Sequence, residues 1–106
     1  MKRTVYNKLV RDLIPGIIEA SGREAVTAQI DSGDRLLHLR EKLKEEMAEY
    51  LQSGSMEELA DLLEVIHSLA DCSGQTWDAL EAMRLKKKRQ RGGFDKGILL
   101  LEVIEP

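Results

Sequence analysis

The sequence has little of three things on which small proteins often rely: cysteine, aromatic side chains and long apolar runs. A single cysteine, Cys72, excludes an intramolecular disulfide, so we expect a reduced, intracellular setting. Aromatic residues make up only 4% of the 106 residues, so the core must be built from Leu, Ile, Val, Ala and Met. No stretch approaches the roughly 20 apolar residues that span a bilayer, and the start MKRTVYNKLVRD lacks the apolar segment of a secretory signal. We therefore expect a cytoplasmic protein that does not enter a membrane.

The chain also lacks an excess of positive charge. Sixteen Lys and Arg residues face nineteen Asp and Glu residues, giving a net charge of −3, which disfavours a general affinity for nucleic acid. The balance hides two opposite patches, because acids gather between residues 41 and 64 while RLKKKRQR (residues 84–91) is strongly basic. The length fits one domain, residues 1–106, and the 42% hydrophobic content argues against disorder.

Hydrophobic spacing predicts a mainly helical fold. Residues 34–52 and the segment carrying Leu59, Leu62 and Ile66 have apolar positions three and four apart, and SGS at 53–55 is a tight turn. So short a connection makes these two helices antiparallel neighbours. A short helix should start at Pro15, and a third long helix should run from Trp77 to Arg91 after the N-cap Thr76. AVTAQI (25–30) and GILLLEVI (97–104) read as strands, which we expect to pair as a small two-stranded β-ribbon beside the helical core.

The segment EEMAEYLQSGSMEELAD, residues 45–61, crowds carboxylates around that helical hairpin. Glu46 and Glu49 are three residues apart on the first helix, and Glu58 and Asp61 repeat the spacing on the second. Each pair borders the apolar stripe of its helix, so the turn should face the two pairs toward each other. Partly buried like charges are unfavourable unless a cation compensates them, and Mg²⁺ prefers such oxygen ligands.

A plainer interpretation remains open for the same residues. Glutamate is common on solvated helix surfaces, and Glu45 and Glu49 could pair with Lys42 or Lys44. In SMEE, residues 55–58, Ser55 and Glu58 have the spacing of a capping box, which would occupy Glu58 at the helix start. Spacing alone therefore leaves both a metal site and a solvated face as explanations.

The whole pattern resembles a known family. EEMAE and ELAD resemble the E-E-x-x-E and E-x-x-D motifs of the MazG-like, all-α nucleoside triphosphate pyrophosphohydrolases, which include phosphoribosyl-ATP pyrophosphohydrolase. VYNKLVRDLIP at the start and KKKRQRGGFDKGILL near the end are similar to a subgroup described as house-cleaning nucleotide pyrophosphatases. The interval between Glu49 and Glu58 is shorter than in many members, and Gly16 stands where members of the subgroup often have an acid.

The resemblance implies a helical core that associates as a homodimer or homotetramer and cleaves a nucleoside triphosphate into a monophosphate and pyrophosphate. It implies that Glu46, Glu49, Glu58 and Asp61 bind Mg²⁺, or Mn²⁺ in its place. It also implies a catalytic role for Glu46 and Glu49 at the metal, and for Glu45 in orienting or deprotonating the attacking water. The function implied by the resemblance is therefore hydrolysis of modified or unneeded nucleoside triphosphates.

A triphosphate also requires cationic partners, and two segments offer them. The candidate substrate-binding residues lie in NKLVRD and in the basic run before GGF: Asn7, Lys8, Arg11, Lys87, Lys88 and Arg91. The same basic run, residues 84–91, carries the competing hypothesis of a nucleic-acid-binding or regulatory helical protein. Against that hypothesis, the run has no interleaved aromatic residues, and basic residues near a helix C-terminus also complement the helix dipole. A helical interaction module without turnover is a third reading.

Overall fold

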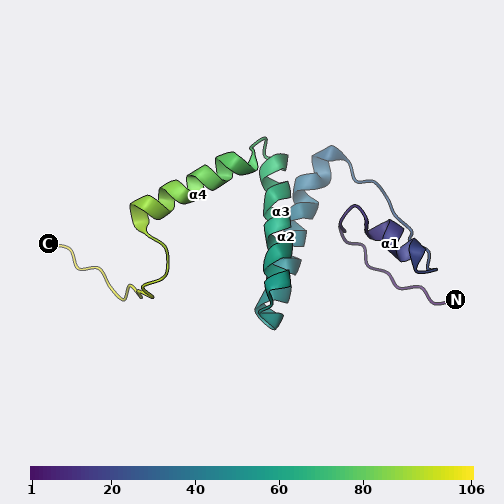
Figure 1. The fold of residues 1–106 in the computed structure, drawn as a ribbon, viewed down its shortest axis with the longest axis horizontal. Coiled ribbons are helices and arrows are strands. Elements are labelled where there is room, and N and C mark those ends of the chain that lie inside the picture. The colour runs from purple at the N-terminus through teal and green to yellow at the C-terminus, as the bar shows by residue number, and fades with distance from the viewer.

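The structure, a computed structural model, describes residues 1–106 and contains only helices as regular elements (Figure 1). The mainly helical class predicted from the sequence is confirmed. In chain order the elements are α1 (Ile14–Ala20), the 3₁₀ turn η1 (Ser32–Asp34), α2 (Arg35–Ser53), α3 (Met56–Cys72) and α4 (Trp77–Arg91).

Helices α2 and α3 form the predicted antiparallel hairpin at the centre of the molecule (Figure 1). Gly54 ends α2 in the left-handed conformation, with φ of 65°, and its N–H donates to the Tyr50 carbonyl over 2.7 Å. Ser55 then caps α3, because its side chain accepts the Glu58 backbone N–H. Only these two residues separate the helices, so side chains near the turn on one arm must face those on the other.

Helix α4 leaves the hairpin at the opposite end from that turn and points away from it (Figure 1). Thr76 caps it as predicted, its Oγ1 accepting the Ala79 N–H over 3.0 Å. The Trp77 ring stacks on the His67 ring of α3, with the ring centroids 3.7 Å apart and the planes 9° from parallel. This stack joins the start of α4 to α3.

The predicted two-stranded β-ribbon is wrong. Residues 25–30 form an extended connection between α1 and α2, and residues 97–104 lie in the C-terminal tail on the other side of the hairpin (Figure 1). Alternating β-branched residues favour an extended backbone, but a strand also needs a partner for its N–H and C=O groups. The two segments are too far apart to supply that partner to each other.

The single chain has very little core. Only Leu39, Val65 and Glu46 are buried, and the chain extends over 70 × 31 × 23 Å. Its radius of gyration is 18.9 Å, whereas a compact domain of this length has about 13 Å. None of the helices combines the length and the apolar character that crossing a membrane requires.

Candidate metal centre

Three carboxylates from the two arms of the hairpin converge near its turn. Glu46 comes from α2, and Glu58 and Asp61 come from the first half of α3. Each offers one oxygen such that the three oxygens lie within 4.8 Å of one another. We call these three residues the acidic triad. The convergence follows from the short turn together with the three-residue spacing of Glu58 and Asp61, which puts both on one face of α3.

The triad holds carboxylate oxygens with no partner in the protein. Glu46 is only 6% exposed and is the one buried charged residue of the chain. The Oε2 atoms of Glu46 and of Glu58 are buried and accept no hydrogen bond. Native proteins rarely leave buried polar oxygens unsatisfied, because each one costs free energy of desolvation. The two orphaned oxygens therefore call for a positively charged or hydrogen-bonding ligand between the arms.

Capping does not account for Glu58. Ser55 Oγ accepts the Glu58 backbone N–H over 3.3 Å, so the first half of the expected capping box is present. The reciprocal half is absent, because the Ser55 N–H donates to Ser53 Oγ over 3.2 Å and the Glu58 Oε2 stays unpartnered. The Glu58 carboxylate is thus available to the triad while its backbone supports the helix start.

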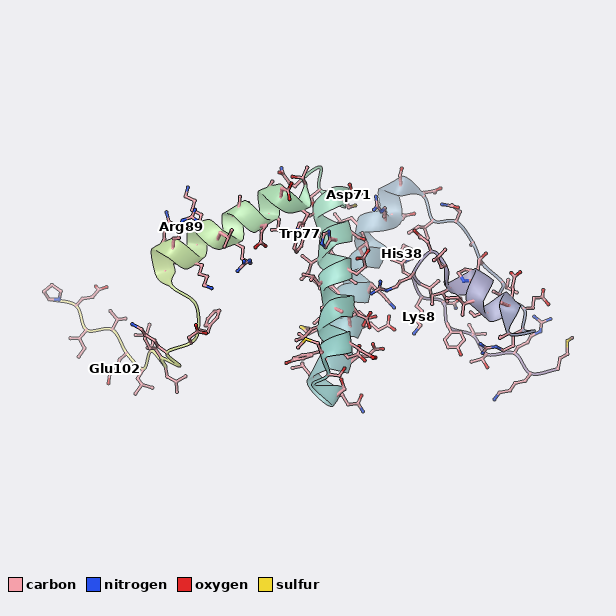
Figure 2. The ribbon with its side chains drawn as sticks, in the orientation of Figure 1. Lys8, His38, Asp71, Trp77, Arg89 and Glu102 are labelled. Atoms are coloured by element: carbon pink, nitrogen blue, oxygen red, sulfur yellow. The ribbon has the colours of Figure 1, made fainter.

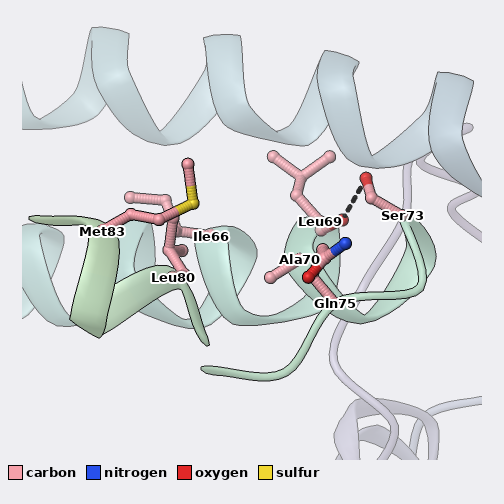
Figure 3. Close-up of a pocket in the computed structure, with 7 residues that line it drawn as sticks. All are labelled: Ile66, Leu69, Ala70, Ser73, Gln75, Leu80 and Met83. Carbon is pink, nitrogen blue, oxygen red and sulfur yellow. Dashed lines mark hydrogen bonds between the residues drawn. The ribbon is translucent and has the colours of Figure 1, made fainter. Parts of the chain in front are cut away.

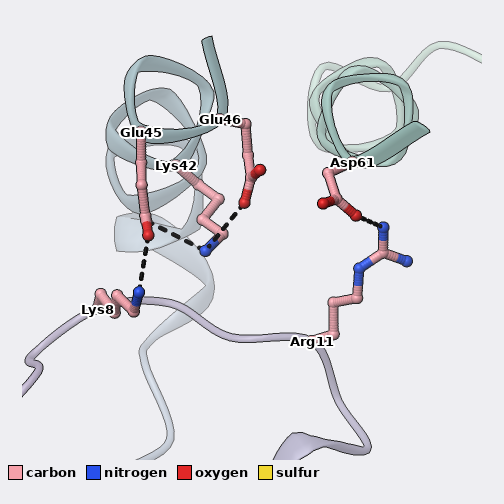
Figure 4. Close-up of polar contacts among 6 residues, drawn as sticks. All are labelled: Lys8, Arg11, Lys42, Glu45, Glu46 and Asp61. Carbon is pink, nitrogen blue, oxygen red and sulfur yellow. Dashed lines mark hydrogen bonds and ion pairs between the residues drawn. The ribbon is translucent and has the colours of Figure 1, made fainter. Parts of the chain in front are cut away.

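Three cationic side chains surround the acids (Figure 4). Lys42 lies one turn before the acids on α2, with its Nζ 3.1 Å from Glu45 Oε2 and 3.3 Å from Glu46 Oε1. The other two come from the N-terminal segment: Lys8 Nζ donates to Glu45 Oε1 over 2.8 Å, and an Arg11 Nη donates to Asp61 Oδ1 over 2.7 Å. None of these four contacts involves the orphaned Oε2 atoms of Glu46 and Glu58.

The surroundings shift the pKa values of the adjacent residues Glu45 and Glu46 in opposite directions. Burial raises the pKa of the Glu46 carboxyl, the neighbouring Glu49 raises it further, and Lys42 opposes the shift. Burial would also raise the pKa of Glu45, but the hydrogen bonds from Lys8 and Lys42 outweigh it and the net pKa is lowered. The hydrogen bond to Glu45 in turn raises the pKa of Lys8. Glu45 is therefore held ionised, whereas the charge on Glu46 is the unfavourable one that a cation would stabilise.

The donor set of the triad fits a hard divalent cation. It consists of carboxylate oxygens only, two of them buried without a partner, and the N-terminal segment passes beside Glu46 and Asp61 (Figure 4). Mg²⁺ and Mn²⁺ prefer such oxygen ligands and keep waters or phosphate oxygens at their remaining positions.

The other predicted site residues lie at different distances from the triad. Glu49 is outside the triad but close enough to Glu46 to raise its pKa. Lys87, Lys88 and Arg91 lie on the exposed half of α4. Arg89, in the same run, is on the opposite side of the hairpin from Lys8 (Figure 2). Within one copy, the structure brings Lys8 and Arg11 to the acids and leaves the basic run of α4 apart from them.

Asn7 contributes a bend rather than a contact. It is the only residue other than glycine with a positive φ, 47°, and the chain bends at Lys8 next to it. Asparagine tolerates this left-handed conformation better than most residues. The bend turns the segment where the Lys8 side chain meets Glu45 (Figure 4).

Sequence reasoning did not place Lys42 among the site residues. Its side chain is only 15% exposed and contacts two of the acids. The available signal was its spacing, three residues before Glu45 and four before Glu46, which puts all three on one helix face.

The best-defined apolar hollow lies elsewhere. It encloses about 280 Å³ between α3 and α4, where Ile66, Leu69, Leu80 and Met83 line it (Figure 3). One of its few polar contacts is local, since Ser73 Oγ donates to the Leu69 carbonyl over 2.9 Å. The hollow has none of the charges of the triad, so it is a packing surface rather than part of the metal centre.

Comparison of the chain with protein-family models, with curated proteins and with solved structures finds no match.

Proposed function

We propose that the chain is a Mg²⁺-dependent nucleoside triphosphate pyrophosphohydrolase acting on modified or unneeded nucleotides in the cytoplasm. The observation that carries the proposal is the acidic triad, with its oxygens within 4.8 Å and its buried, unpartnered Oε2 atoms on Glu46 and Glu58. The resemblance of EEMAE and ELAD to the MazG-like motifs names these three residues, together with Glu49, independently of this geometry. Lys8 and Arg11 beside the triad supply the positive charge that a triphosphate needs.

The reaction adds water across the α–β phosphoanhydride, so the α–β bond breaks and a monophosphate and pyrophosphate form. Glu46, Glu58 and Asp61 would hold Mg²⁺ or Mn²⁺, which would supply positive charge against the phosphate oxygens. Glu45, kept ionised by Lys8 and Lys42, orients the attacking water by accepting a hydrogen bond from it. Glu49, which is close enough to Glu46 to raise its pKa, would accept the proton that the water loses.

We further propose that the protein works as a homodimer or homotetramer. Large apolar side chains on the hairpin and α4 remain exposed in one copy, including Met47 at 49%, Leu63 at 47% and Met83 at 61%. The hollow between α3 and α4 adds an apolar surface that a second copy could fill. A second copy would also be the source from which Lys87, Lys88 and Arg91 could reach a triphosphate.

The test is product analysis on a panel of ordinary and modified nucleoside triphosphates, with Mg²⁺ or with EDTA. We expect a monophosphate and pyrophosphate in Mg²⁺ only, and a loss of about 100-fold or more in Glu46→Gln, because metal assistance supplies several kcal/mol to such reactions. Glu57→Gln is the matched control, since Glu57 is exposed on the same helix beside Glu58. Inactivity across the panel in folded wild-type protein would contradict the proposal and turn attention to the basic residues 84–91.

A further inference from the structure

The first thirteen residues form a segment that ordinary packing does not hold. We call residues 1–13 the N-terminal strap. It contains no helix or strand, and all its residues except Leu9 are exposed. Its backbone hydrogen bonds reach only the start of α1, where the Arg11 and Leu13 carbonyls accept the N–H groups of Ile14 and Ile17, and none joins it to the hairpin. Helix α1, which follows it, does not pack on the hairpin either. Neither a core nor a backbone ladder explains why the strap lies beside the acids.

Two ion pairs join the strap to the hairpin. Lys8 pairs with Glu45 of α2 and Arg11 pairs with Asp61 of α3, so the strap bridges both arms (Figure 4). Both pairs are partly solvated, with 42% of the Lys8 side chain and 54% of the Arg11 side chain exposed. Exposed ion pairs of this kind are weak and are screened by salt, so a competing charge can break them.

The two pairs differ in their relation to the triad. Asp61 belongs to the triad, whereas Glu45 does not. A divalent cation bound by Glu46, Glu58 and Asp61 would give Asp61 a stronger partner than Arg11 and would repel the guanidinium beside it. The same cation would not disturb the hydrogen bond between Lys8 and Glu45. The bend at Asn7 helps to hold Lys8 in that position.

We propose that the N-terminal strap is a latch that a divalent cation releases and a substrate phosphate closes again. In this structure Arg11 pairs with Asp61 and puts a positive charge beside the triad. Cation binding frees Arg11 while Lys8 stays on Glu45, and the freed guanidinium then binds a phosphate group of the nucleotide, whose oxygens match its paired N–H donors. This inference rests on the proposed function, and it adds an order of events in which metal binding precedes phosphate capture by the strap.

A competing role for Arg11 makes the opposite predictions. If Arg11 stayed on Oδ1 and merely oriented Asp61 so that Oδ2 faces the metal, its removal would weaken cation binding. If Arg11 competes with the cation, as we propose, its removal strengthens cation binding. The sign of one affinity change therefore separates a latch from a positioning residue.

The first experiment measures Mg²⁺ affinity by calorimetry for full-length wild type, Arg11→Gln and Arg35→Gln. Arg35 is the matched control, because it pairs with Asp71 across the same two helices at the other end of the hairpin. We expect Arg11→Gln to bind Mg²⁺ several-fold more tightly than wild type and Arg35→Gln to bind it equally. An Arg11→Gln variant that binds Mg²⁺ more weakly or equally would overturn the latch.

The second experiment follows the strap directly through ¹⁵N–¹H heteronuclear NOE values of its backbone amides. Mg²⁺ alone should lower the values for residues 8–11, and Mg²⁺ with a non-hydrolysable α,β-methylene triphosphate should raise them above the metal-free level. In Arg11→Gln the metal-free values should already be low and should not respond to Mg²⁺. Amides around Glu46 and Asp61 that shift with Mg²⁺ while the strap values stay constant would refute the latch and leave the proposed function standing. No shift of those amides would refute both.

Discussion

At the scale of the residue, the most informative feature is Glu46, a buried glutamate with one carboxylate oxygen that accepts no hydrogen bond. Glu46 is as buried as the apolar residues Leu39 and Val65, yet one of its oxygens has no hydrogen bond. A protein that needed only stability would gain by placing an apolar side chain there, because buried unpaired charge is costly. The proposed metal ion would offset this cost.

This feature predicts that Glu46→Gln stabilises the metal-free protein at neutral pH. Because the pKa of Glu46 is raised on folding, the folded state binds its proton more readily than the unfolded chain does. The metal-free protein then loses stability as the pH rises through that pKa, and the neutral glutamine avoids the loss. We expect a higher melting temperature for Glu46→Gln in EDTA at pH 7.5, measured by circular dichroism. The difference should vanish below about pH 4.3, where the unfolded carboxyl also becomes protonated.

Glu57→Gln is the control for this comparison, because its side chain is exposed and is not part of the triad. It should change the melting temperature little at either pH. A lower melting temperature for Glu46→Gln at pH 7.5 would mean that the Lys42 ion pair outweighs the cost of burying the charge, and it would contradict this account.

At the scale of the element, the hairpin turn decides whether the site exists. Gly54 adopts a left-handed conformation that brings α3 back along α2 after two residues. Gly54→Ala should therefore destabilise the fold by about 1 kcal/mol, because a Cβ is unfavourable at that φ although nothing crowds it. Urea unfolding followed by circular dichroism measures this change.

Gly33→Ala provides the matched control. Gly33 lies in η1 at the other end of α2, has no positive φ, and has open space around its added Cβ. It should change the unfolding free energy by much less than Gly54→Ala. Equal effects of the two substitutions would show that the left-handed turn contributes nothing special to the hairpin.

The elements that could be predicted from sequence are those fixed by local interactions. The 53–55 turn, the Ser55 and Thr76 caps and the three long helices depend on neighbours within a few residues, and all are present. The ribbon between residues 25–30 and 97–104 depended on pairing across the whole chain, which the pattern of β-branched residues does not specify. The meeting of Glu46 with Glu58 and Asp61 could be predicted because one short turn relates the two helices.

The contacts of the cationic residues Lys8 and Arg11 with the acids could not be predicted from the sequence. Lys8 and Arg11 were named only as candidates for substrate binding, since no local rule connects them with acids 37 and 50 residues away. Lys42 was visible as a helical neighbour of the acids but not as a member of the site. The stack of His67 on Trp77 likewise joins two helices through side chains whose meeting no periodicity indicates.

At the scale of the whole molecule, one copy of the chain is extended and buries little apolar surface. Three buried residues and a radius of gyration of 18.9 Å leave most apolar side chains in contact with solvent. Small domains are marginal even when compact, because their conformational entropy nearly offsets their buried area. The proposed homodimer or homotetramer would supply further apolar contacts.

We therefore expect light scattering coupled to gel filtration to give a mass of at least twice the 12.0 kDa of one chain. Met83→Glu, which places a charge in the hollow between α3 and α4, should lower that mass. Glu57→Gln should leave the mass unchanged, because Glu57 is exposed to solvent. A wild-type monomer that unfolds cooperatively and hydrolyses nucleotides at assay concentration would contradict the proposed assembly.

The most direct test of the central claim is a Mg²⁺ titration by isothermal calorimetry of wild type, Glu46→Gln, Asp61→Asn and Glu57→Gln. The acidic triad predicts saturable Mg²⁺ binding in wild type and Glu57→Gln. It also predicts a loss of at least about tenfold in affinity in the two triad variants, because each removes a charged oxygen ligand. Equal Mg²⁺ binding by all four proteins, or none by wild type, would show that these carboxylates are not a metal centre.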